Sequence, residues 1–254
     1  AILDGNFYGF PNNFNTDFNL HTNIGNINLN GAINNDLDIV PNPYYFIRAH
    51  VNNLNVNELL NLKDEIQTSF YIDLSGEGIT KQDAALQTTI DKEKIKYKDN
   101  EFVNIHVDGD YENQQLMATT DVDSDAVELT LEAMLDVSDI IPDYTVKLDL
   151  SKADLYALNL YKKDKTMLLS TKLDAQIKGT DIDKMYGDIH VYNTSLYDSR
   201  GHYVIDTLNV SLVENYHDSK NIIVNCDFFD MDVNGVVNFR NFGNTFKNYV
   251  LTYF

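Results

Sequence analysis

Four acidic residues of one short segment have the spacing of a calcium-binding loop. Positions 1, 3, 5 and 12 of that loop fall on Asp121, Asp123, Asp125 and Glu132, and carboxylate oxygens are the ligands that Ca²⁺ prefers. The position that needs glycine for the sharp turn is Ala126, however, and the residues after it alternate like a β-strand with no flanking helix. We therefore interpret the segment as the acidic end of a hairpin, and the sequence predicts no metal site.

The other residue types that perform catalysis are scattered along the chain. The six histidines form no pair at a metal-binding spacing such as HxH or HxxxH. Cys226, the single cysteine, lies in the apolar alternation Ile222, Val224, Cys226, so we interpret it as a small buried hydrophobic residue. No nucleophile elbow, phosphate-binding loop or dinucleotide-binding motif is present. The sequence predicts neither an enzyme nor a cofactor.

Composition excludes two further classes of function. Lys and Arg number 19 and Asp and Glu 39, so the formal net charge is −20. Phosphate backbones repel so acidic a chain, which argues against nucleic-acid binding, and a basic patch for anionic lipid surfaces is equally improbable. No apolar run approaches the roughly 20 residues that cross a bilayer as a helix.

Strict alternation of apolar and polar residues dominates the chain and predicts the elements that position its side chains. This period of two is typical of antiparallel strands with one apolar and one solvated face. It is clearest in the segments 27–33, 70–74, 126–137, 144–151 and 231–239. Predicted turns separate such runs at residues 34–36, 98–100, 108–110, 198–201 and 217–220. Short helical turns are expected at 55–62, 80–85, 151–161 and 181–186.

Internal repeats relate distant parts of the chain at a period of about 100 residues. Residues 43–51 align with 142–150, residues 59–62 with 157–160, and residues 69–78 with 170–179. The strand beginning at Tyr249 resembles the start of a third copy. Because no Pro-, Gly- or Ser-rich linker intervenes, we expect one continuous segment over 1–254, with approximate repeats at 1–62 (partial), 63–160 and 161–254.

Three stretches carry a resemblance to a known family. They are GNINLNGAI at 25–33, IIPDYTVKLDLSKADLYALNL at 140–160 and LSTKLDAQIKGTDID at 169–183. Together they resemble the periplasmic region of TamB-type proteins of Bacteroidetes, which belong to the AsmA-like, repeating β-groove superfamily. The resemblance implies an all-β fold: a long antiparallel sheet curled into a taco-like groove with an apolar interior and a few short helical turns.

The same resemblance implies a function and a location. The chain would be an internal, periplasmic fragment of an envelope protein anchored to the inner membrane. Its groove would conduct phospholipid acyl chains between the inner and outer membranes, or aid outer-membrane assembly together with an outer-membrane β-barrel. Membrane contact would be made through other parts of the parent protein.

The physics of an uncovered sheet leads to a similar expectation. An apolar sheet face without covering helices must close, stack or hold something apolar. Under the groove interpretation the apolar alternations line one path. Its predicted lining residues are Val127, Leu129, Leu131, Val146, Leu148, Leu150, Leu173, Val210, Leu212, Val224, Val233 and Val237.

Two other architectures remain open at this level. One is a secreted β-sandwich that binds a glycan or a protein ligand, although the absence of Trp counts against stacking on sugars. The other is an outer-membrane barrel, which also alternates apolar and polar residues.

Overall fold

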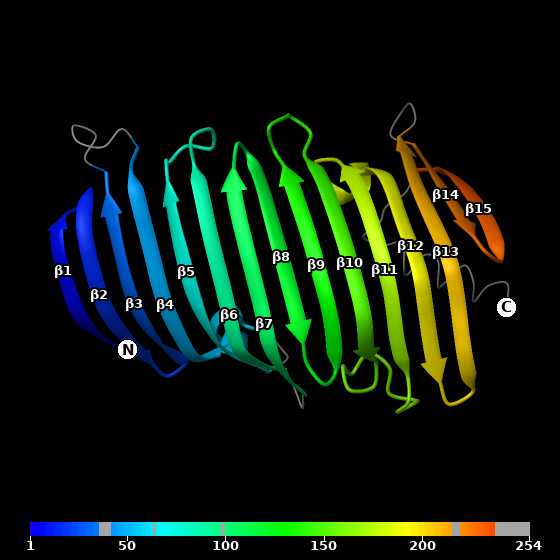
Figure 1. Cartoon of the computed structure of the whole chain (residues 1–254), viewed down its shortest axis with the longest axis horizontal. Coiled ribbons are helices and arrows are strands. Elements are labelled where there is room, and N and C mark those ends of the chain that lie inside the picture. The colour runs from blue at the N-terminus through cyan, green and yellow to red at the C-terminus, as the bar shows by residue number, and fades with distance from the viewer. Residues whose placement is uncertain (36–41, 63–64, 98–99, 215–218, 237–254) are drawn as a thin grey trace.

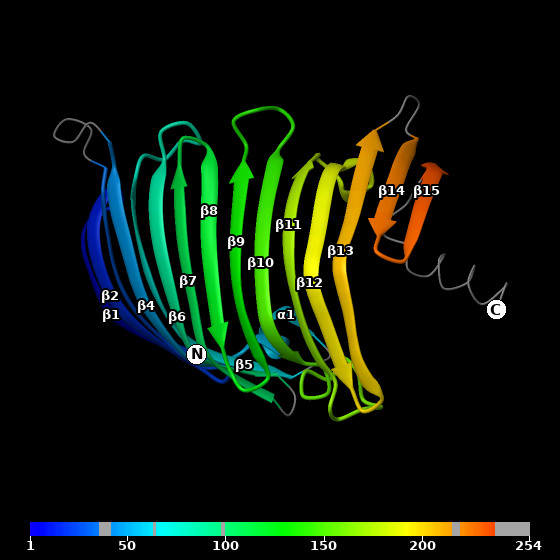
Figure 2. The ribbon, with the colours of Figure 1, turned by 45° about the vertical axis from the view of Figure 1, so that its right-hand side comes forward.

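The described part of the chain forms one long, open antiparallel sheet. The computed structural model describes residues 1–35, 42–62, 65–97, 100–214 and 219–236 (Figure 1). Within these residues fifteen strands pair in sequence order, each with its neighbours along the chain. The strands bend along their length, so the sheet curls (Figure 2). Fifteen strands spaced about 4.8 Å apart extend about 67 Å in the hydrogen-bonding direction.

The strands are 7 to 14 residues long. Their bounds are β1 Ile2–Phe10, β2 Asn13–Thr22, β3 Gly25–Asn34, β4 Tyr44–Asn55, β5 Ile66–Glu77, β6 Ala85–Tyr97, β7 Asn100–Glu112, β8 Gln115–Asp123, β9 Val127–Asp136, β10 Asp143–Asp154, β11 Leu168–Lys178, β12 Tyr186–Asp198, β13 Gly201–Glu214, β14 Lys220–Cys226 and β15 Phe229–Gly235. The predicted all-β, antiparallel fold is therefore confirmed. A β-sandwich would need a second sheet, whereas every described strand belongs to this one.

The register of the strands separates apolar from polar residues. One row of directly opposed residues crosses all fifteen strands: Gly5, Phe18, Leu29, Ala49, Ile72, Ile90, Val107, Thr120, Leu131, Leu148, Leu173, Val191, Leu208, Cys226 and Phe229. Thr120 is its one polar member. Since side chains alternate between faces along a strand, the apolar rows share one face, and this face is the interior of the curl.

The adjacent row on the other face is polar throughout. Its members are Asn6, Asp17, Asn30, Arg48, Asp73, Thr89, Asp108, Thr119, Glu132, Lys147, Asp174, His190, Asn209, Asn225 and Asp230. This separation follows from the period of two, because a slip of one residue would turn every apolar side chain to water.

The repeat seen in the sequence reappears in the connections between strands. Gly78 donates its backbone N–H to the carbonyl of Pro43, and Gly179 donates to Pro142 in the same way. Strands β4 and β10 both carry a bulge near their ends, after Val51 and Leu150. The unit from β4 to β9 therefore corresponds to the unit beginning at β10, six strands and about 100 residues later.

Helical structure is confined to short connections. Of the expected turns, 55–62 contains helix α1 (Val56–Leu60) and 181–186 contains the 3₁₀ helix η1 (Ile182–Lys184). The turn expected at 151–161 begins later than predicted, because residues up to Asp154 belong to β10. A single hydrogen-bonded turn follows, in which Leu158 donates its N–H to the Asp154 carbonyl and the Asp154 carboxylate accepts the N–H groups of Tyr156 and Ala157. Residues 80–85 also form a turn rather than a helix.

One predicted turn lies in a strand instead. Residues 108–110 belong to β7, and the chain reverses at Asn113 and Gln114, which both have positive φ. Gly109 is buried on the apolar face, where an added Cβ would approach the Thr88 methyl group to 2.9 Å. The glycine therefore relieves crowding between strands, while Asn tolerates the left-handed turn. The turn predicted at 198–201 is confirmed between β12 and β13.

Candidate functional site

Eleven of the twelve predicted lining residues lie on the apolar face. Leu131, Leu148 and Leu173 are directly opposed on β9, β10 and β11. Val210 opposes Val224 on β13 and β14 in the same way. The others on this face are Val127, Leu129, Val146, Leu150, Leu212 and Val233. Val237 lies outside the described residues. The structure thus brings these side chains together, and their contact with lipid stays a prediction.

The apolar face is filled by its own side chains toward β13–β15. Leu212, Ile222 and Val224 form a packed cluster with exposed fractions of 9%, 5% and 7%. Around them pack Leu208, Val210, Met231 and Val233. Water is therefore largely excluded from this cluster, whereas Phe229 on the same face of β15 remains 44% exposed.

Toward β1–β4 the same face is hollowed. A cavity of about 490 Å³ is lined there by apolar side chains, among them Phe7, Phe14, Phe18, Ile33 and Ile47. Phe7 and Ile47 remain 56% and 41% exposed. None of the residues around the cavity carries a carboxylate or an ammonium group.

Two glycines beside the hollow allow neighbouring strands to approach closely. Gly5 is paired with Phe18, and a Cβ added to Gly5 would lie 2.6 Å from the Cβ of Phe18. Gly76 is paired with Tyr45, whose ring an added Cβ would approach to 3.1 Å. The predicted lining set includes no residue of this hollow. Its signal in the sequence was the alternation of residues 27–33, in which Gly31 replaces an apolar side chain.

The opposite face carries charges and hydrogen-bonding groups. Arg48 and Asp73 form an exposed ion pair at 2.9 Å. Both nitrogens of the His106 ring face carboxylates, Nδ1 at 2.5 Å from Asp91 and Nε2 at 2.8 Å from Asp108. Hydrogen bonds to these two carboxylates raise the pKa of His106 above its ordinary value of 6.5. This face is therefore suited to water, as a solvated exterior requires.

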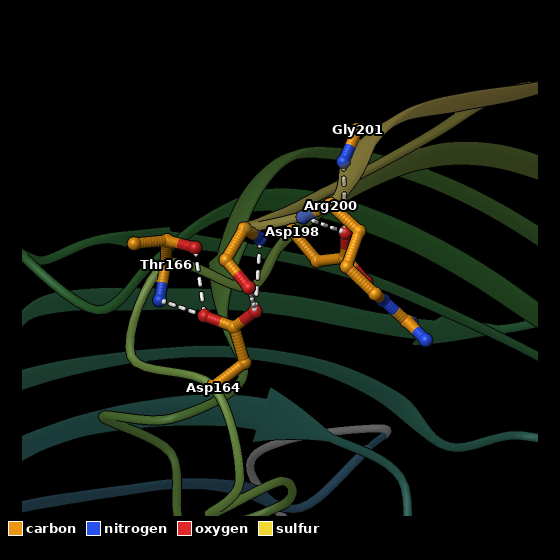
Figure 3. Close-up of polar contacts among 6 residues, drawn as sticks. Asp164, Thr166, Asp198, Arg200 and Gly201 are labelled. Atoms are coloured by element: carbon orange, nitrogen blue, oxygen red, sulfur yellow. Dashed lines mark hydrogen bonds and ion pairs between the residues drawn. The ribbon is translucent and has the colours of Figure 1, made fainter.

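Two aspartates organise the loops at one end of the strands (Figure 3). Asp164, in the β10–β11 loop, accepts hydrogen bonds from the backbone N–H and hydroxyl groups of Thr166 and Ser199. These bonds hold the pKa of the Asp164 carboxyl far below its usual range. Asp198 accepts the backbone N–H groups of Arg200 and Gly201 and pairs with the Arg200 guanidinium. The contacts fasten the β10–β11 loop to the β12–β13 turn, so they shape the rim of the groove.

The acidic segment considered as a calcium loop does not gather its carboxylates. Asp121 and Asp123 lie on β8, Asp125 in the following turn and Glu132 on β9. Asp121 accepts the Thr130 hydroxyl instead. In the part of the chain that the structure describes, no three His, Cys, Asp or Glu side chains are placed to hold a metal ion. None of its described helices is long and apolar enough to cross a membrane.

Comparison with family models, curated proteins and solved structures finds no match for this chain. The geometry of the groove is therefore the basis for an argument about function.

Proposed function

We propose that this chain is a segment of a non-enzymatic cell-envelope protein that carries phospholipid acyl chains along its apolar groove. The cargo would pass between the inner and outer membranes, or the groove would serve outer-membrane assembly, as in the TamB-type proteins that the sequence resembles. The protein would be periplasmic and anchored to the inner membrane. Its partners would be phospholipids and an outer-membrane β-barrel of the assembly machinery.

The observation that carries this proposal is the row that crosses all fifteen described strands of an open sheet and is apolar at every position except Thr120 and the glycine Gly5. A monomer rarely exposes so large an apolar surface without a binding partner. Each methylene group transferred from water into the groove contributes about 0.8 kcal/mol. An acyl chain therefore gains enough free energy to leave water, while its head group can stay solvated at the open side of the curl.

Movement along the groove is favoured by the chemistry of the apolar row. Apart from Thr120, its members offer an acyl chain no hydroxyl or charged group. Contacts with an acyl chain are then non-directional, so the chain can slide along the row without breaking a hydrogen bond. The polar row on the other face lets the exterior of the same strands remain in water.

Transfer of a fluorescent phospholipid between donor and acceptor vesicles tests the proposal. The purified chain should accelerate transfer, and Leu148→Asp should abolish the acceleration because it places a carboxylate in the middle of the path. Lys147→Gln is the matched control, since Lys147 is the exposed neighbour on the other face. Equal transfer by all three proteins, or no transfer by the unmodified chain, would contradict the proposed function.

A further inference from the structure

We propose that the hollow between β1 and β4 is the subsite that holds an acyl chain, whereas the groove at β13–β15 stays filled by the protein itself. This inference rests on the proposed function and adds to it a position. It divides the groove into a segment that is ready for cargo and a segment that must rearrange before cargo can enter.

The lining of the hollow is almost entirely apolar. The hollow is bordered by phenylalanine, leucine and isoleucine side chains with two hydroxyl-bearing residues, Thr16 and Tyr45, and no residue with a full charge. In contrast, a pocket across β2–β6 has Asp17, Asp73 and Arg48 of the polar face in its lining. Only an apolar ligand is stabilised by transfer into the first of these two sites.

The hollow is elongated across the strands of the sheet. Lining residues come from four successive strands: Phe7 on β1, Phe14 on β2, Ile33 on β3 and Ile47 on β4. Strands repeat every 4.8 Å or so, which makes the hollow about 14 Å long across the sheet. The apolar row then continues from β4 to Ile72 on β5. An elongated chain that lies across the strands fits this site better than a single ring or a compact ligand does.

Apolar side chains at the hollow are far more exposed than those of the packed cluster on β13 and β14. Phe7 and Ile47 are 56% and 41% exposed, whereas Ile222 and Val224 are 5% and 7% exposed. A ligand at β1–β4 covers apolar surface that is in contact with water. A ligand at β13–β15 would have to displace side chains that already cover one another, which loses as much burial as it gains.

The absence of Trp makes a direct test possible, because one introduced Trp is the sole reporter of its kind. We would place it singly in the hollow (Phe14→Trp), in the packed segment (Met231→Trp) and on the polar face (Tyr71→Trp). The probe is stearate brominated in the middle of its chain, which quenches Trp fluorescence on contact. We expect saturable quenching of Phe14→Trp, with at most a tenth of that quenching in the other two variants at the same stearate concentration.

A second substitution separates specific binding from a general apolar attraction. Ile47→Asp in the Phe14→Trp background should weaken quenching at least tenfold. Val213→Asp, which places the same charge on the polar face of β13, should leave quenching unchanged. Circular dichroism of each variant checks that the sheet is retained. Quenching of Met231→Trp in preference to Phe14→Trp would overturn the inference but leave the proposed function standing. Quenching in none of the three variants, or equally in all, would overturn both.

Discussion

Replacing Leu148 by Asp distinguishes an open groove from a closed core. Leu148 is half-buried, lies between Leu131 and Leu173, and faces no second sheet among the described strands. Full burial of a leucine contributes about 1.5–3 kcal/mol, so the half-buried side chain loses about 1 kcal/mol. Partial desolvation of the new carboxylate adds about 1 kcal/mol. The free energy of unfolding should therefore fall by about 2 kcal/mol, and the sheet should survive because its backbone pairing is unchanged.

The matched substitution at the packed end of the groove should be far more damaging. Val224 is 7% exposed and contacts the cluster around Leu212 and Ile222. Val224→Asp removes the full free energy gained by burying the valine and places a carboxylate where water is excluded. Together these effects should lower the free energy of unfolding by about 5 kcal/mol. Lys147→Gln, on the solvated face, should change the free energy by less than about 0.5 kcal/mol.

Urea denaturation followed by circular dichroism measures all three differences. The expected order of destabilisation is Val224→Asp, then Leu148→Asp, then Lys147→Gln. If Leu148→Asp unfolds the protein as completely as Val224→Asp does, the middle of the groove is a closed core and the reasoning is refuted.

Three further predictions concern other parts of the sheet. The pKa of His106 is raised by Asp91 and Asp108, so protonated His106 contributes its full stabilisation below pH 6.5, and this stabilisation is lost as pH rises through the pKa in the folded state. An NMR titration that places the pKa of His106 at or below 6.5 would contradict this prediction. Asp164→Ala should accelerate amide hydrogen exchange at Thr166 and Ser199 but not in the central strands; unchanged exchange at both amides would show that the carboxylate does not fasten the loop. Gly78 has φ +74°, and an added Cβ would lie 2.1 Å from the Asp83 carbonyl oxygen. Gly78→Ala should therefore lower the melting temperature well below that of the Gly235→Ala control, in which the added Cβ meets nothing within 4 Å. Equal melting temperatures of the two variants would argue against strain at Gly78.

The strands were the most predictable part of the molecule. Alternation in 126–137 and 144–151 corresponds to β9 and β10, because a sheet with one face in water imposes a period of two on its sequence. Eleven of the predicted lining residues lie on one face because they alternate with polar residues along each strand and because neighbouring strands pair in register.

Local chemistry explains where sequence reasoning failed. Asp108-Gly109-Asp110 has the composition of a turn but lies in β7, because cross-strand crowding at Thr88 requires the glycine. Ser151 was expected to begin a helix, yet it extends β10 into a bulge. The hollow at β1–β4 escaped prediction because its lining comes from four strands, and which of their side chains lie next to one another depends on the strand register.

Native mass spectrometry after incubation with phosphatidylethanolamine–phosphatidylglycerol vesicles tests the central claim most directly, because it detects a phospholipid bound to the folded chain. The account predicts a species whose added mass equals at least one phospholipid, and predicts that this species is depleted in the Ile47→Asp variant. Unmodified protein that emerges free of phospholipid at every vesicle concentration would contradict the claim that this groove holds lipid.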